Sequence, residues 1–174
     1  MLILERSVTE PYWKAHRDYI NRRLSAGRWR RVGRYGVVNI QGNSEVTTYA
    51  VLRDKQPVAW LYLGKREAWH AWEVLQVWVF PEYRGEGLAS KLYRAAVNGD
   101  GLLLASGETQ SKSSRALWRR FIKKKMFNIW AQDFNNLESV ASVSVEDDQL
   151  DCELPVYTRE HGPHDIRLVA AKKG

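Results

Sequence analysis

The sequence is poor in cysteine and has no long apolar run, and both absences narrow what the chain can be. Cys152 is the single cysteine, so an internal disulfide is excluded and no second cysteine completes a metal site. A stretch of 18 or more apolar residues is also missing, which argues against a membrane-spanning helix. The first residues lack the charged start and apolar middle of a signal peptide. These features predict a cytoplasmic protein without a metal ion.

Acidic residues are missing from two stretches that are rich in bases. Residues 21–44 contain six arginines and residues 111–132 contain seven lysines and arginines, and neither stretch has an acid. Residues 134–156 reverse the pattern, with six acids and no base. The formal net charge is +7. This uneven charge favours anionic partners, such as nucleic acid or a cofactor that carries phosphates.

The 174 residues, 44% of them hydrophobic, suit a single domain over residues 1–174. Apolar periodicity and turn residues predict a mixed α/β sheet. We expect a helix between Thr9 and Gly27, an arginine-rich loop over 28–44 with a short strand at 37–40, and one or two strands in the last forty residues. The other expected helices cover 87–97 and 111–126, and the expected strands cover 2–7, 46–53, 58–63, 71–80, 102–105, 127–133 and 165–171.

The most informative segment runs from Val77 to Ser90. A strand stops at Pro81, and the sequence Arg84-Gly-Glu-Gly-Leu-Ala89 then opens a helix. Glycines let a backbone approach a phosphate closely, and the first N–H groups of a helix have no partner within the helix. This turn therefore predicts a site for a pyrophosphate. A dinucleotide-binding fold is the rival interpretation, but it expects three glycines and a parallel βαβ unit with an acid at the next strand end.

Residues 77–90 resemble the signature region of the GNAT acetyltransferases, whose pattern is Gln/Arg-x-x-Gly-x-Gly/Ala. Arg84, Gly87 and Ala89 occupy the pattern, and Val79-Phe-Pro81 before it is also typical. The resemblance extends from about Thr47 to Trp130. It implies a mainly antiparallel central sheet flanked by helices, with a V-shaped opening between the two central strands. It also implies transfer of an acetyl group from acetyl-CoA to a primary amine, which attacks directly.

The resemblance also assigns roles to residues of this chain. The loop would hold the pyrophosphate of CoA, and the main chain of Val77 and Val79 would bond its pantetheine arm. Glu73 lies where several family members keep a general base, and its rival interpretation is a surface carboxylate beside Lys65 and Arg66. Ser111 is a candidate for a CoA hydrogen bond. The loop residues with this predicted role are Arg84, Gly85, Glu86, Gly87, Leu88 and Ala89.

One departure concerns the group that protonates the leaving thiolate. Trp118 stands where the family often has a tyrosine, and an indole N–H cannot serve as that acid. We expect Trp118 to pack in the core. The acid could then be Ser113, another hydroxyl or water. His16 and His70 have no partner in sequence and are interpreted as structural.

The acceptor is the least determined part of the function. Arginines that alternate with aromatic residues suit phosphate contact and base stacking, and a solvated charged loop is the rival interpretation. This favours an amine linked to nucleic acid, either a modified DNA base or an aminoacyl-tRNA, as in phage-borne GNAT-like proteins. The alternatives are a protein lysine or N-terminus, a small molecule, and a non-catalytic module that binds CoA or nucleic acid. A monomer and a homodimer both remain open. The candidate contact residues are Arg28, Trp29, Arg30, Arg31, Arg34 and Tyr35.

Overall fold

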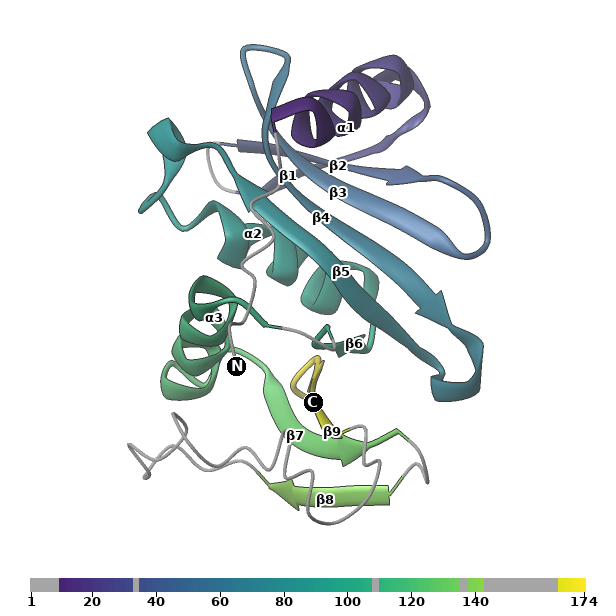
Figure 1. Ribbon diagram of the computed structural model, residues 1–174, viewed down its shortest axis with the longest axis vertical. Helices are drawn as coiled ribbons and strands as arrows, with labels where there is room; N and C mark the ends of the chain where they lie inside the picture. The colour runs from purple at the N-terminus through teal and green to yellow at the C-terminus, as the bar shows by residue number, and fades with distance from the viewer. Residues whose placement is uncertain (1–9, 33–34, 108–109, 135–137, 143–165) are drawn as a thin grey trace.

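A computed structural model (Figure 1) describes residues 10–32, 35–107, 110–134, 138–142 and 166–174. Nine strands form one sheet in the order β1-β2-β3-β4-β5-β6-β9-β7-β8. Every neighbouring pair is antiparallel except β5 and β6, which are parallel. This confirms the predicted mixed α/β sheet and excludes a doubly wound dinucleotide-binding fold. The predicted strand at 2–7 lies outside the described residues.

The helices and strands follow one another largely in the predicted order. The helices are α1 (Glu10–Arg23), α2 (Leu88–Arg94) and α3 (Lys112–Lys123), and α2 continues as a π-helical turn over Ala95–Gly99. The strands are β1 (Arg28–Val32), β2 (Tyr35–Gln41), β3 (Val46–Arg53), β4 (Gln56–Arg66), β5 (Ala71–Val79), β6 (Leu104–Ala105), β7 (Asn128–Asp133), β8 (Glu138–Ser142) and β9 (Ile166–Ala171).

Helices cover both faces of the sheet (Figure 1). On one face, Ile20 of α1 packs against buried apolar residues of β2 to β4 and against Phe80. On the other face, α2 and α3 bury Leu92 and Phe121 against the opposite side chains of the same strands. Successive residues of a strand point to opposite faces, so each strand of this part contributes to both cores. This explains why the central strands are apolar on both sides.

The predicted arginine-rich loop over 28–44 is wrong, because most of it forms an antiparallel hairpin. Strand β1 pairs with β2, with Arg30 opposite Val37, and β2 pairs in turn with β3. Val38 and Ile40 face α1, whereas Val37 faces α2. Three glycines suggested a loop, but Val37, Val38 and Ile40 are buried, and the short strand expected at 37–40 lies within β2.

The two halves of the sheet join through a short parallel contact. Strand β6 pairs with β5 only at Trp72 and Glu73, and with β9 on its other side. Strand β9, from the end of the chain, therefore lies between β6 and β7. The V-shaped opening that the resemblance implies between the two central strands stays a prediction. Within the described ranges, no helix is long and apolar enough to cross a membrane.

Candidate active site

The loop between β5 and α2 leaves open space in front of its glycines. Gly85 has φ of 85° and Gly87 has φ of 73°, values that residues with a Cβ adopt only with strain. A Cβ built on either glycine would meet no atom within 4 Å. The left-handed turns therefore require glycine, and nothing in the described chain covers the backbone that they expose.

The start of α2 adds unsatisfied backbone donors to this loop. Gly87 is the N-cap residue, and no side chain caps the helix, so its first N–H groups remain available to a ligand. Lys91 Nζ lies 3.1 Å from the carbonyl oxygen of Glu86 and adds a positive charge. Arg84 is exposed beside them. Leu88 is buried and can offer only its main chain. The residues predicted to hold a pyrophosphate thus lie together, and the open cradle fits such a group.

Strand β5 presents main-chain groups next to that loop. The N–H of Phe80 donates to the carbonyl oxygen of Val58 on β4. Because hydrogen-bonding groups alternate in direction along an antiparallel strand, those of Val79 and Val77 point away from β4. Strand β6 does not pair with this part of β5. The carbonyl of Val79 accepts a bond from Arg84 Nε at 3.2 Å, so a pantetheine bond to that oxygen would displace Arg84.

A β-bulge interrupts β5 three residues after Trp72. Tyr62 pairs with Gln76 and Leu63 pairs with Val74, which leaves Leu75 as the extra residue. Its side chain is 46% exposed and lies over Gly64, where a Cβ would come within 2.9 Å of Leu75 Cδ1. Bulges bend a strand and redirect its side chains. Here the bulge separates Glu73 from the Val77–Val79 segment.

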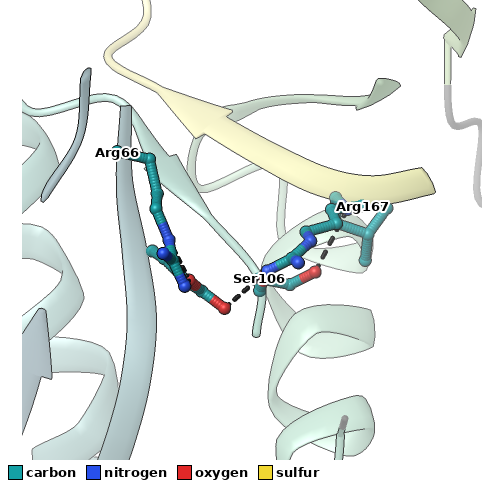
Figure 2. Close-up of polar contacts among 5 residues, drawn as sticks. Arg66, Ser106 and Arg167 are labelled. Atoms are coloured by element: carbon teal, nitrogen blue, oxygen red, sulfur yellow. Dashed lines mark hydrogen bonds and ion pairs between the residues drawn. The ribbon is translucent and has the colours of Figure 1, made fainter. Parts of the chain in front are cut away.

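Glu73 is the centre of an ion cluster that links four segments. Figure 2 labels the other members, Arg66, Ser106 and Arg167. Oε2 of Glu73 accepts a bond from Arg66 Nε at 2.6 Å, and its Oε1 accepts one from Arg167 Nη1 at 2.5 Å. Arg167 also contacts the carbonyl oxygen of Ser106, whose Oγ accepts the N–H of Leu168. Glu73 and Arg167 are 5% and 7% exposed. The interpretation of Glu73 as a surface carboxylate is therefore wrong.

The cluster constrains what Glu73 can do. Both of its oxygens accept charge-assisted bonds, which are stronger than neutral ones, yet each carboxylate oxygen has two lone pairs. Arg66 contacts Oε2 through both Nε and Nη2, so the lone pair that can still accept a proton through a water molecule is on Oε1. Sequence reasoning noted Arg66 but missed Arg167 and Ser106, because no local pattern connects residues from β9 and β6 to β5.

The start of α3 contains the two predicted serines. Ser111 is the N-cap residue and accepts a bond from the N–H of Ser114 at 3.2 Å. Ser113 is exposed on the first turn. Trp118 is 1% exposed and packs edge-on against Tyr93 at 5.8 Å, which confirms the prediction that it belongs to the core.

Tyr93 of α2, which is buried, and His16 of α1, which is partly buried, have shifted pKa values. Burial raises the pKa of the Tyr93 phenol, so this group stays protonated. Burial lowers the pKa of His16, whose ring lies 5.3 Å from the rings of Trp60 and Tyr62. His16 is therefore neutral at pH 7 and packs with aromatic rings, in agreement with its predicted structural role.

The arginine-rich hairpin lies away from Glu73. Strand β1 carries Arg28, Trp29, Arg30 and Arg31 at the edge of the sheet, and Tyr35 begins β2. Arg34 lies outside the described residues. Four strand-to-strand steps of roughly 4.8 Å separate β1 from β5, a distance of about 19 Å across the sheet. The structure does not bring the hairpin and the bulge of β5 together.

Residues 9–121 match the family model described as Acetyltransferase (GNAT) family, and this range contains the bulged strand, the glycine loop and α3 almost entirely. The chain belongs to the GNAT acetyltransferase family. It is therefore an acyl-CoA-dependent N-acyltransferase, and acetyl-CoA is its acetyl donor. No curated protein and no solved structure matches the chain. The identity of the GNAT fold thus rests on the family model and on the order of the elements described above.

Proposed function

We propose that this GNAT enzyme acetylates a primary amine that is attached to a nucleic acid, either a modified DNA base or an aminoacyl-tRNA. Acetyl-CoA, when bound, supplies a thioester carbonyl that an amine can attack directly. The residues below bind and orient the two substrates and move protons. We further propose that it acts in the cytoplasm of a bacterium or of a phage-infected bacterium.

Donor binding is assigned to the glycine loop and the end of β5. The backbone amides of residues 84–89 would hold the pyrophosphate, helped by the charges of Arg84 and Lys91 and by the dipole of α2. The outward main-chain groups of Val77 and Val79 would hold the pantetheine arm. One of their N–H groups would also face the carbonyl oxygen on which negative charge develops. Ser111 would add a hydrogen bond from the start of α3.

Proton transfer is assigned to Glu73 and Ser113. Glu73 would accept the proton of the attacking ammonium through a water molecule, at a lone pair that the two arginines leave unused. The Oγ of Ser113 would supply a proton to the leaving sulfur. Trp118 cannot do so, because its indole is buried and is not an acid.

The acceptor proposal rests on the position of the arginines in the hairpin. Residues 21–44 contain six arginines without an acid, Arg28 is exposed, and β1 is the edge strand. A small acceptor at β5 would not reach arginines about 19 Å away across the sheet. A polymer with regularly spaced phosphates would contact both places at once.

The experiment incubates the enzyme with acetyl-CoA carrying a labelled acetyl group and with total DNA, RNA and protein as separate fractions. Mass spectrometry should find labelled acetyl-amines in a nucleic-acid fraction. The variant Arg28→Glu/Arg30→Glu should lose most of this product while its binding of acetyl-CoA remains. The matched control Lys172→Glu/Lys173→Glu makes the same change of net charge at exposed residues after β9.

One outcome would contradict the acceptor assignment, and another would contradict the role of the hairpin. Label that appears only on protein lysines or N-termini would replace the nucleic acid by a protein acceptor. If the hairpin variant labels nucleic acid as strongly as the wild type does, the acceptor is a nucleic acid but the hairpin does not contact it.

A further inference from the structure

The charged residues of α3 are all basic. Five bases lie in the helix and a sixth, Lys124, is its C-cap residue, and the helix contains no acid. Five of the six are exposed, and Arg119 is partly buried. We call this surface the basic face of α3, and it consists of Lys112, Arg115, Arg119, Arg120, Lys123 and Lys124. Trp118, Phe121 and Ile122 are buried on the opposite side.

The arrangement of these charges opposes the stability of the helix. Bases three or four positions apart are neighbours on a helix surface and repel each other. Five such pairs occur: 112 with 115, 115 with 119, 119 with 123, 120 with 123, and 120 with 124. Lys112 and Arg115 also lie in the first turn, where the helix dipole disfavours cations. Acids at some of these positions would stabilise the helix. Because the helix has bases there instead, the charge pattern indicates that they bind an external anion.

The basic face has the dimensions and chemistry of a surface for a phosphate backbone. Lys112 and Lys123 are 11 residues apart, which corresponds to about 16 Å along the helix. This length covers several successive phosphates of one duplex strand, which lie about 3.4 Å apart along the axis. The aromatic side chains of α3 are buried, so this face offers no stacking platform of the kind that single strands use.

We propose that the basic face of α3 binds the backbone of a double-stranded nucleic acid. The inference rests on the proposed function in one respect, namely that the partner is a nucleic acid. It adds a second contact surface, because α3 connects β6 to β7 while the arginine hairpin lies at the β1 edge (Figure 1). The duplex contacts this face through charge alone, and therefore without reading its sequence.

The test measures binding of a fluorescent DNA duplex of about 20 base pairs by anisotropy at several salt concentrations. Arg120→Glu/Lys123→Glu should weaken binding at least about tenfold and should reduce the slope of log affinity against log salt by about 2. Lys172→Glu/Lys173→Glu, with the same change of net charge, should alter affinity less than about threefold. Circular dichroism checks that the charge-reversed variant folds. If it does not fold, the milder variant Arg120→Gln/Lys123→Gln takes its place in the binding measurement.

Each other outcome overturns the proposal in a distinguishable way. Equal losses in both double variants would mean that net charge alone attracts DNA. Unchanged DNA binding with a raised KM for acetyl-CoA would assign the basic face to the phosphates of CoA. Tighter binding of a single strand of the same length would mean that the partner of the basic face is single-stranded. The anisotropy measurement tests the duplex contact, whereas the acetylated product, measured with the hairpin variant, tests the proposed acceptor. Failure of one proposal can therefore be told from failure of the other.

Discussion

Arg167 Nη1 of β9 lies 2.5 Å from Oε1 of Glu73 on β5, although the two residues are 94 positions apart in the sequence. Both side chains are buried, and Arg66 of β4 contacts the second oxygen of the same carboxylate. The cluster lies where β5 and β6 pair at only two positions. It therefore links the two halves of the sheet beside the bulge that carries Leu75.

Replacing Glu73 by glutamine should slow acetyl-CoA turnover at neutral pH by about a hundredfold or more, because general-base catalysis contributes on the order of 10²–10⁴. Arg167→Gln breaks the same ion pair but keeps the carboxylate. We expect this variant to be less stable and to retain most of its turnover below its melting temperature. Single-turnover rates and thermal melting of both variants provide the measurement.

Equal loss of turnover in Glu73→Gln and Arg167→Gln would show that the integrity of the cluster matters and that Glu73 does not transfer the proton. Unchanged turnover in Glu73→Gln would remove the residue from catalysis altogether.

Replacing Gly87 by alanine should weaken acetyl-CoA binding at least about tenfold, because the strain of a left-handed alanine, about 1–2 kcal/mol, disturbs the loop and its Cβ enters the open cradle. Gly101 is a matched control, since its φ is 71° and a Cβ there also meets nothing within 4 Å. Gly101→Ala should lose similar stability and keep its affinity. Titration calorimetry with acetyl-CoA compares the two, and equal affinities would contradict the cradle.

Acidification should destabilise the folded enzyme through His16. Burial lowers the pKa of His16 in the folded state below 6.5, so the unfolded chain binds more protons as the pH falls below that value. The free energy of unfolding should therefore decrease between about pH 6.5 and the lowered folded-state pKa. His16→Phe should remove this component, whereas His70→Asn at an exposed position should keep it. Urea unfolding at pH 7.5 and 5.5 measures the difference, and parallel pH dependence in wild type and His16→Phe would contradict it.

Replacing Tyr93 by phenylalanine should leave the free energy of unfolding unchanged or raise it by up to about 1 kcal/mol, because a buried hydroxyl without a good hydrogen bond costs desolvation. Tyr49→Phe is the contrasting variant. The hydroxyl of Tyr49 donates to Asp100 Oδ2 at 2.7 Å, and bonds to charged groups contribute about 1.5–3 kcal/mol. Denaturant unfolding should therefore rank Tyr49→Phe well below Tyr93→Phe, and the reverse order would mean that the Tyr93 hydroxyl is bonded.

Local patterns were sufficient to predict the glycine loop and most elements. The loop from Arg84 to Ala89 is predictable because its two glycines and the start of the helix that follows are both visible in a short segment. The same is true of Trp118, whose helical spacing with Phe121 predicts burial. Strand β9 was identified from its apolar run, but its place between β6 and β7 was not.

The parts that could not be predicted depend on contacts between distant segments. Arg167 has no sequence feature that links it to Glu73, and the bulge at Leu75 arises from the pairing of β4 with β5. Strand β1 was missed and β2 was predicted only over 37–40, because the glycines of this segment favoured a loop. The strand conformation of that segment is determined by its pairing with β3, which is a tertiary effect.

The position of β9 has a consequence for how the enzyme is made. Leu104 and Ala105 of β6 and Trp130 of β7 have their sheet neighbour in residues 166–171, so this interior edge stays uncovered until residues 166–171 have been synthesised. During translation the nascent chain would present an unpaired strand to other chains, which is a known route to aggregation. Deletion of residues 166–171 should therefore leave a polypeptide that retains the whole glycine loop and yet fails to accumulate in the cell.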